Sequence, residues 1–318
     1  MAKADQQRFR LISRVLGLFC GTILSVRTVE KRIALTFDDG PDPDHTPRLL
    51  DVLARHGARA TFFLVGERAA RHADLVARLA AEGHEIGNHS WDHPSLPTLE
   101  GSAQADQLRR ARDALAPHGG RLMRPPYGDQ TFRTHGVARR LGYRVVLWSV
   151  NGGDWRGEDA ATLTERLLAR AVPGAIVLLH DSLQSFEDPA FRDRAPTFEA
   201  VERLIAARPD HRFVTVSELL ALGRPVERVK FRTSETTWLD GLDTAQEGVP
   251  AIGPVTEHAV NPLPALALAR GSGGGAGQGP DYGPEHGSGH GPGHGPAPQR
   301  PRRGPTSGSR PKPVRVRA

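Results

Sequence analysis

Cysteine is almost absent from this chain. Cys20 is the only cysteine among 318 residues, so no disulfide can form within the chain. A metal site built from thiolates needs several cysteines and is excluded as well. Any metal that the protein binds must therefore be held by nitrogen and oxygen ligands.

Apolar runs of membrane-spanning length are also missing. The run over 15–26 has twelve residues, which suits a signal sequence but is shorter than the roughly 18 residues of a membrane span. It is preceded by Lys3, Arg8, Arg10 and Arg14. No small-residue cleavage motif follows, and Phe19 before Cys20 does not suit lipidation. For segment 1–29 a signal, an anchor and a first helix or strand all stay open, and with them an extracytoplasmic, membrane-anchored or cytoplasmic location.

Acidic residues are absent from 300–318, where seven of the 42 Lys and Arg residues lie. Without those seven, 35 basic residues stand against 36 acidic ones, a net charge of −1, so the formal charge of +6 belongs to this tail. Such a tail can contact nucleic acid, anionic lipid or an acidic wall polymer, or it can simply be solvated. We expect no specific nucleic-acid binding.

The residues after 222 contain little that predicts a folded domain. Segment 271–318 consists mainly of Gly, Pro, Arg and Ser, which predicts a disordered tail. Its three spaced histidines are better explained as solvated than as ligands, because nothing there can fix a coordination geometry. Segment 223–270, with Trp238, is an extension that we leave unassigned.

Between 30 and 222, short apolar segments alternate with helical patterns, as in repeated βα units. The predicted strands are 33–37, 60–65, 84–88, 122–125, 144–150 and 175–180. The predicted helices are 46–56, 73–82, 102–116, 133–141, 160–171 and 197–207. This alternation predicts an α/β domain with a parallel sheet, and six or more units favour a barrel over an open sheet.

Chemically active side chains follow several of these predicted strands. Asp38 and Asp39 end the first strand, His89 the third, Arg124 the fourth and His180 the last. Because the carboxyl ends of barrel strands meet at one face, this position predicts a shared site.

Asp39, His89 and His93 have the composition of a catalytic metal site. One carboxylate and two imidazoles make three ligands and leave a fourth position open. The two histidines are four residues apart, so both rings can reach one cation. Zinc is the expected ion, and Co, Ni, Mn or Fe are also possible. Such an ion can lower the pKa of a bound water to about 7.

Asp38 is the candidate general base, although a carboxylate before Gly40 and Pro41 can also be an ordinary turn residue. Arg124 can orient Asp38, or it can form a surface salt bridge worth about 0–1 kcal/mol. Tyr127 follows two prolines, so its backbone N–H is a candidate donor to an oxyanion.

Two further residues have a functional and a structural interpretation. His180 follows an apolar run, where a histidine is either a satisfied core residue or a general acid for an amine leaving group. Trp155, on a polar loop after Asp154, is either partly buried or stacked on a sugar ring.

These motifs, in this order over about 30–222, resemble those of the NodB-homology polysaccharide deacetylases, carbohydrate esterase family 4. The resemblance implies a distorted, incomplete (β/α) barrel. It implies that Asp38 is the base and Asp39 a metal ligand, with His89 and His93 as the other two ligands. Arg124 would hold the base, and the Tyr127 amide would lie in the oxyanion hole.

The resemblance also assigns the last two motifs. Leu178 would line the acetyl pocket and His180 would be the acid, with Asp154 and Trp155 in the substrate-binding region. The family motif Asp-x-x-Asp-Trp departs here, because its first position is Asn151. If that carboxylate normally tunes the acid, its loss puts the pKa of His180 in question, with Asp154 or Asp181 as candidates to compensate.

We therefore expect a metal-dependent hydrolase that acts on carbon–nitrogen bonds other than peptide bonds. It would remove N-acetyl groups from a chitooligosaccharide-like or peptidoglycan-like substrate, with a metal-bound water as nucleophile. The alternatives are an O-acetyl ester, a formamido sugar or a small cyclic amide as substrate, or a carbohydrate-binding pseudoenzyme, for which Asn151 is the only sequence feature.

Overall fold

The computed structural model describes residues 20–184 and 189–233. The predicted disordered tail over 271–318, most of segment 223–270 and the basic start of segment 1–29 lie outside these residues. In the described part of the chain, no helix has both the length and the apolar character needed to cross a membrane.

The strands in this part of the chain are β1 (Gly21–Arg27), β2 (Arg32–Asp38), β3 (Thr61–Leu64), β4 (Glu85–Asn88), β5 (Gly119–Met123), β6 (Arg144–Val145), β7 (Val150–Asn151), β8 (Ile176–His180), β9 (Arg212–Phe213) and β10 (Arg224–Val229). The helices there are α2 (Thr46–Arg55), α3 (Gly66–Arg71), α4 (Ala73–Ala81), α5 (Gly101–Leu115), α6 (Phe132–Arg140), α7 (Ala160–Arg170), α8 (Ala195–Ala206) and α9 (Val216–Ala221).

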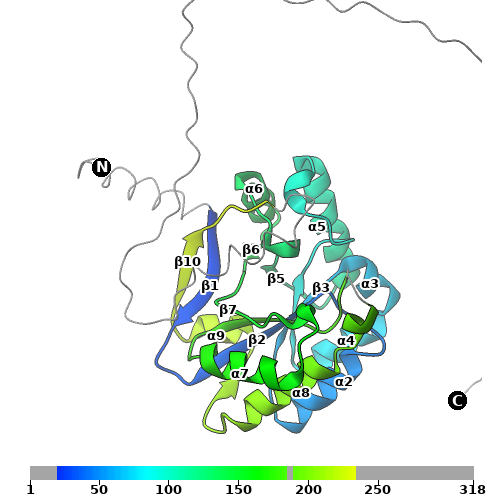
Figure 1. The fold of residues 1–318 in the computed structure, drawn as a ribbon. Helices are drawn as coiled ribbons and strands as arrows, with labels where there is room; N and C mark the ends of the chain where they lie inside the picture. The colour runs from blue at the N-terminus through cyan, green and yellow to red at the C-terminus, as the bar shows by residue number, and fades with distance from the viewer. Residues whose placement is uncertain (1–19, 185–188, 234–318) are drawn as a thin grey trace, which may run out of the picture. The chain divides into compact units, whose positions relative to one another are not determined.

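The main sheet is parallel and curls into a half-barrel (Figure 1). Its strand order is β6-β5-β4-β3-β2-β8-β7, and β9 also pairs with β2. Helices α7, α8, α2, α4, α5 and α6 pack one against the next and cover the outside of the sheet. The predicted α/β half-barrel is thus confirmed, and each predicted strand and helix has a counterpart.

The two faces of the central strands have different surroundings: one packs in the hydrophobic core and the other faces the inside of the half-barrel. Leu35 and Phe37 of β2, like Leu179 of β8, pack outward in the main hydrophobic cluster. Residues in between point to the inside of the half-barrel, because side chains alternate along a strand. Asp38 of β2 lies beside His180 of β8 in the register of the sheet, so both end at the same edge.

One predicted strand, 144–150, is two short strands in the structure. β6 pairs with β5, whereas β7 pairs with β8 at the other edge of the sheet. Between them the Leu147 N–H donates to the Ile23 carbonyl of β1 over 2.8 Å. The segment therefore crosses the open side of the half-barrel, and its hydrogen-bond partners change on the way.

Two strands, β1 and β10, lie outside the segment 30–222. β1 pairs with β10 in a separate antiparallel ribbon (Figure 1). Ile23 and Val26 of β1 are buried in one hydrophobic cluster with Ala34 and Ile176 of the main sheet. Residues 21–27, at the end of segment 1–29, are therefore a strand that packs against the main sheet.

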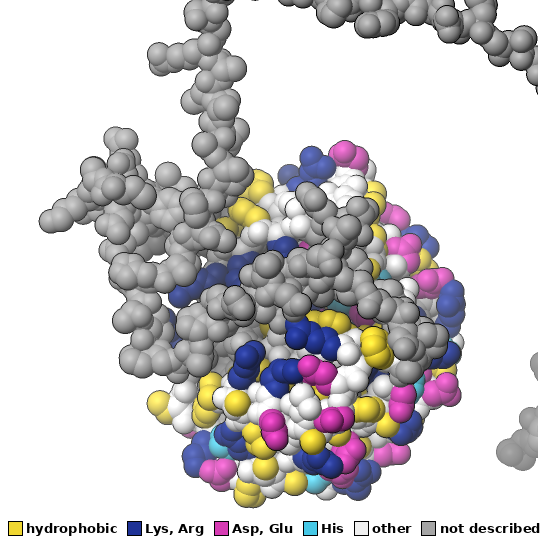
Figure 2. All heavy atoms as spheres, in the orientation of Figure 1, with side chains coloured by type: hydrophobic (Ala, Val, Ile, Leu, Met, Phe, Trp, Pro, Cys, Tyr) yellow, Lys and Arg dark blue, Asp and Glu magenta, His cyan; other side chains and the backbone are white. Residues whose placement is uncertain are grey.

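Basic and acidic side chains are interspersed over the described surface in the view of Figure 2. No large area of one charge covers the helices that face the viewer there. This distribution agrees with the small net charge of the chain without its tail.

Candidate active site

Backbone strain is concentrated at the carboxyl edge of the sheet. Among the described residues, the non-glycine residues with positive φ are Asp39 (73°), Ser90 (66°), His93 (65°) and Tyr127 (59°). Such conformations cost about 1–3 kcal/mol each, persist only where the surrounding structure holds them, and are concentrated at functional sites in proteins. Three of the four are residues that the sequence predicts for the site, and the fourth supports one of them.

Asp39, His89 and His93 converge on one point, and all three are buried. Asp39 Oδ1 lies 3.3 Å from His89 Nε2 and 3.1 Å from His93 Nε2. One ligand atom from each of the three lies within 4.8 Å of the others, and the described residues contain no second group of this kind. Burial opposes ionisation of Asp39, but the attraction of His93 and the close polar contacts with both histidines hold the pKa of Asp39 well below its usual value.

Neighbouring residues set the orientation of these three side chains. His89 Nδ1 donates to the Arg124 carbonyl over 2.7 Å, which leaves the lone pair on Nε2. The Gln184 N–H donates to Asp39 Oδ2 over 2.9 Å and leaves Oδ1 toward the histidines. The His93 N–H donates to Ser90 Oγ over 3.1 Å and fixes the loop of that ligand.

This donor set fits a divalent cation. Two imidazole nitrogens and one carboxylate oxygen suit zinc and the other first-row ions predicted from the sequence. The hydrogen bond at His89 Nδ1 matches the support that metal-bound histidines usually have. The identity of the ion stays a prediction.

Asp38 is held by a buried arginine. Arg124 Nη1 donates to Asp38 Oδ1 and to Thr36 Oγ1, both over 2.7 Å. The Arg124 side chain is fully buried, and its other nitrogens donate to main-chain carbonyls, which excludes the alternative of a surface salt bridge. Asp38 Oδ2 is left facing His89, 3.9 Å from its Nε2.

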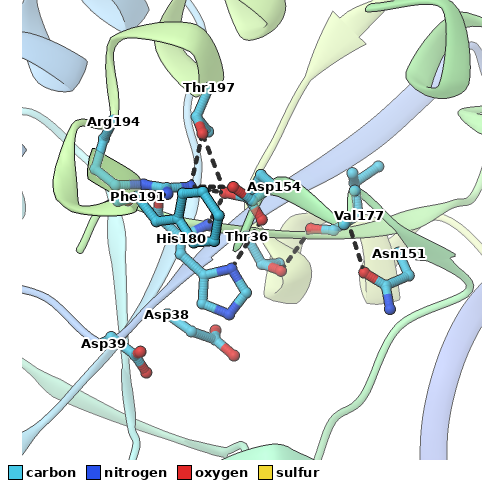
Figure 3. Close-up of polar contacts among 12 residues, drawn as sticks. Thr36, Asp38, Asp39, Asn151, Asp154, Val177, His180, Phe191, Arg194 and Thr197 are labelled. Carbon is cyan, nitrogen blue, oxygen red and sulfur yellow. Dashed lines mark hydrogen bonds and ion pairs between the residues drawn. The ribbon is translucent and has the colours of Figure 1, made fainter. Parts of the chain in front are cut away.

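His180, at the end of β8, is held by Asp154 of the short 3-10 helix η3 (Asp154–Arg156) (Figure 3). His180 Nδ1 donates to Asp154 Oδ1, and the His180 backbone N–H donates to Asp154 Oδ2, both over 2.9 Å. Burial opposes protonation of the ring, but the attraction of Asp154 and its hydrogen bond raise the pKa of His180 above its usual value. The imidazole lies between Asp154 and Asp38.

The burial of Asp154 does not fit the predicted contact with substrate. Its side chain is 0% exposed, and its oxygens are occupied by His180, Arg194 and Thr197. Burial opposes its ionisation, yet His180 and Arg194 lower the pKa of Asp154. In the structure Asp154 contacts His180, Arg194 and Thr197, and its role stays a prediction.

Asn151 and Asp181, the other two residues considered as partners of His180, form their hydrogen bonds elsewhere. The Asn151 side-chain oxygen Oδ1 accepts the Gly153 N–H over 3.0 Å and shapes the turn before η3. Asp181 accepts from Thr46 Oγ1 and packs against Gly40, where an added Cβ would lie 2.2 Å from Asp181 Oδ2. Burial raises the pKa of Asp181 to about 7. Asp154 thus supplies the carboxylate beside His180, and Asn151 leaves that contact intact.

Three more predicted residues lie around the same site. Tyr127, in η2 (Pro126–Gly128), packs its ring edge-on against His93 with ring centroids 4.6 Å apart. Trp155 packs edge-on against His180 at 5.3 Å, and it is only partly buried. Leu178 is buried two residues before His180, so both lie on the inner face of β8.

Arg194 and Thr197 were missed by the sequence reasoning. Arg194 is one of many arginines in the chain and lies at the start of α8, far from any motif. Nothing in the local pattern separates it from a solvated arginine. Only its burial, with 2% of the residue exposed, reveals its contact with Asp154.

Comparison with known proteins places this chain in a family. Residues 25–146 match the family model described as Polysaccharide deacetylase. A chitooligosaccharide deacetylase of Bradyrhizobium sp. is 39% identical over 184 residues, which cover 56% of this chain and 84% of that protein. The chain belongs to the polysaccharide deacetylase family.

The peptidoglycan-N-acetylglucosamine deacetylase PgdA of Listeria monocytogenes is 43% identical over 154 residues, or 48% of this chain. The match spans only 32% of the length of PgdA. The similarity between this chain and PgdA is therefore limited to about a third of the length of PgdA.

Solved structures of the family have the same fold. The Bc1960 peptidoglycan N-acetylglucosamine deacetylase superposes with a TM-score of 0.56 at 33% identity, covering 62% of this chain and 91% of that one. BA3943 of Bacillus anthracis, described as a family 4 pseudoenzyme, gives 0.57 at 25% identity and covers 63% of this chain and 69% of its own. Because a pseudoenzyme shares the fold, activity must be argued from the site.

Proposed function

We propose that the protein is a metal-dependent deacetylase that removes N-acetyl groups from an amino-sugar oligomer or polymer. One observation carries this proposal. A buried cluster of three metal-ligand side chains lies at the edge of the sheet where Asp38 and His180 end adjacent strands, and each of these two is oriented by a buried partner.

Asp39, His89 and His93 are proposed to hold the cation. When bound, a divalent ion supplies Lewis acidity, which lowers the pKa of a water and polarises an acyl oxygen. The chain would supply three ligand atoms: Nε2 of His89, Nε2 of His93 and one carboxylate oxygen of Asp39. All three residues are buried, and Asp39 and His93 have positive φ.

Asp38 is proposed as the general base. Arg124 holds one of its oxygens, so the other is presented in a fixed direction toward the ligand cluster. A water deprotonated there would attack the acetyl carbonyl. The positive-φ turn at Tyr127 is proposed to point its backbone N–H at the resulting oxyanion, where a fixed donor lowers the barrier.

His180 is proposed as the general acid for the departing nitrogen. Its Nδ1 proton is engaged by Asp154, so Nε2 is the atom that delivers a proton to the amine. Leu178 on the same face of β8 is proposed to line the acetyl pocket. Trp155 would shield the His180 ring and offer the rest of its surface to a sugar.

The substrate class rests on the relatives, which are deacetylases of peptidoglycan N-acetylglucosamine and of chitooligosaccharides. The same site can also serve an O-acetyl ester, a formamido sugar or a small cyclic amide, since no described residue distinguishes these acyl groups. We favour this function over a carbohydrate-binding pseudoenzyme, because Asn151 hydrogen-bonds to Gly153 while Asp154 occupies the position beside His180, and the three candidate ligands lie together.

The first experiment is acetate release from chitin oligomers by metal-free protein, before and after zinc is restored. We expect release only with zinc. We expect Asp38→Asn to bind zinc like the parent but to lose roughly two to four orders of magnitude in rate, since it lacks a base.

Parent-like turnover by zinc-loaded Asp38→Asn would overturn the role of Asp38. If the zinc-loaded parent releases no acetate, the same protein should be tested on peptidoglycan fragments, acetyl esters and formamido sugars. Inactivity on that whole panel would contradict the proposed function.

A further inference from the structure

Arg194 is buried beneath the loop that carries Asp154. A buried guanidinium is costly unless its donors are satisfied. Arg194 Nη2 donates to Asp154 Oδ2, to the Asp154 carbonyl over 3.0 Å and to Thr197 Oγ1 over 2.7 Å. Its other nitrogens donate to the His180 carbonyl over 3.4 Å and to the Phe191 carbonyl over 3.2 Å. One side chain thus connects η3, the end of β8 and the segment before α8.

The contact with Asp154 is specific to one oxygen. Asp154 Oδ2 accepts from Arg194, Thr197 Oγ1 and the His180 backbone N–H, whereas Oδ1 accepts from the His180 ring (Figure 3). With Oδ2 held on one side, the carboxylate cannot rotate, so Oδ1 stays aimed at Nδ1. The positive charge of Arg194 also balances the carboxylate in a place that water does not reach.

We propose that Arg194 is a positioning residue that acts through Asp154 to hold the His180 imidazole for proton delivery. This inference rests on the proposed function and extends it to a residue about which the motifs say nothing. Arg194 makes its hydrogen bonds to Asp154, Thr197 and the His180 and Phe191 carbonyls, and none of these residues is Asp38 or a candidate metal ligand, so its removal should impair one proton transfer and spare the other.

Substrates with different leaving groups can separate the proton transfer by His180 from the one by Asp38. An amide nitrogen must be protonated before it can depart, so amide hydrolysis depends on the general acid. An aryl acetate such as 4-nitrophenyl acetate releases a stabilised phenolate that needs no proton. Loss of acid positioning should therefore slow the amide reaction alone, whereas collapse of the site should slow both.

The test compares Arg194→Gln with the parent, both zinc-loaded, on chitin oligomers and on 4-nitrophenyl acetate. For the amide we expect kcat to fall about 10- to 100-fold, part of the usual general-acid contribution, with KM within about twofold of the parent. For the ester we expect kcat within about twofold of the parent. Arg194→Lys should recover part of the amide rate, because it keeps the charge but not the planar fork of donors.

Arg203→Gln is the matched control, because Arg203 is an exposed arginine of the same helix that pairs with Glu199. It should change neither reaction. Equal losses on amide and ester, or no loss on the amide, would overturn the positioning role. Thr197→Val is a milder second variant, expected to show the same amide-only loss at a few-fold, and it answers the question if Arg194→Gln does not fold.

A substrate-free readout separates this inference from the proposed function. The His180 Nδ1 proton, shared with a buried carboxylate, should give a downfield proton resonance in the parent that His180→Gln lacks. Arg194→Gln should broaden or shift that resonance, whichever acyl substrate is correct. An unchanged resonance would overturn the inference even if no sugar substrate were found, whereas a failed acetate assay alone would count against the proposed function.

Discussion

At the scale of single residues, each proton-transfer group is half of a pair. Asp38 is oriented by Arg124, and His180 is oriented by Asp154. The residues of the first pair were both visible as motif positions. The sequence does not specify the partner of His180, because Asp154, Asp181 and the motif position occupied by Asn151 are all close to it in the motifs. Distance decides among them, since only Asp154 has its carboxylate within hydrogen-bond reach of the ring.

The ligand role of His93 gives a prediction at this scale. His93→Ala should weaken zinc binding, because one of three ligands is lost, and activity should return partly at high zinc. A competition titration with a chromogenic chelator measures the affinity, with Asp38→Asn as the control that keeps all three ligands. Parent-like zinc affinity in His93→Ala would contradict the ligand assignment.

At the scale of elements, the strands were easier to predict than their partners. A run of apolar residues identifies a strand, but the same run pairs with one edge of the sheet or the other according to the path of the chain. The pattern over 144–150 predicts one strand, but its first part pairs with β5 at one edge of the sheet and its last part pairs with β8 at the other. Between these two parts the chain hydrogen-bonds to β1. Strand partners are long-range contacts, so a local pattern cannot specify them.

The packing of β1 against the main sheet predicts its effect on stability. Ile23 is 1% exposed and packs with the inner cluster of the half-barrel. Ile23→Ala should lower the free energy of unfolding by about 2–5 kcal/mol, because it removes buried contacts and leaves a cavity. Urea unfolding followed by circular dichroism measures this.

Val29→Ala is the control for that experiment, because Val29 follows the same strand and is 96% exposed. It should change the free energy of unfolding by no more than about 0.5 kcal/mol. Equal effects of the two variants would show that β1 is not packed as described.

The junction of α4 and β4 predicts how stability depends on pH. His84 Nδ1 accepts the Ala60 N–H over 3.1 Å at the start of β3, and burial lowers the pKa of His84 to about 4. The unfolded chain, with a histidine pKa of about 6.5, binds the proton more readily. Stability from His84 is therefore complete above about pH 6.5 and is lost as the pH falls toward 4, on the order of 3 kcal/mol.

His84→Asn tests this, because the asparagine oxygen can accept the same hydrogen bond but does not titrate. The loss of unfolding free energy between pH 7 and pH 4.5 should be smaller in His84→Asn than in the parent, measured by urea unfolding at each pH. His118→Asn, at an exposed position, should keep the parent's dependence. An unchanged pH dependence in His84→Asn would contradict the assignment.

At the scale of the whole molecule, charge is divided between the folded part and the tail. The chain without 300–318 has a net charge of −1, and the tail adds seven positive charges. We predict that any binding to an anionic wall polymer or to nucleic acid is electrostatic, weakens steeply with salt and is lost when 300–318 are deleted. Titration of full-length and truncated protein with a fluorescent polyanion at two salt concentrations measures this, and salt-insensitive binding would contradict it.

The sequence alone determined the fold class, the family and the three side chains that the structure brings together as a possible metal site. Alternating apolar segments specify βα units, and a motif at the end of a strand carries its side chains to the carboxyl edge wherever the strand lies in the sheet. The tertiary structure decided what depends on distance between remote segments. It placed β1 across the open side of the half-barrel, chose Asp154 over Asp181 as the partner of His180, and buried Arg194 behind that pair. A carboxylate or a guanidinium has the same local sequence signal at the surface and in the core, and only its surroundings in the folded chain determine its role.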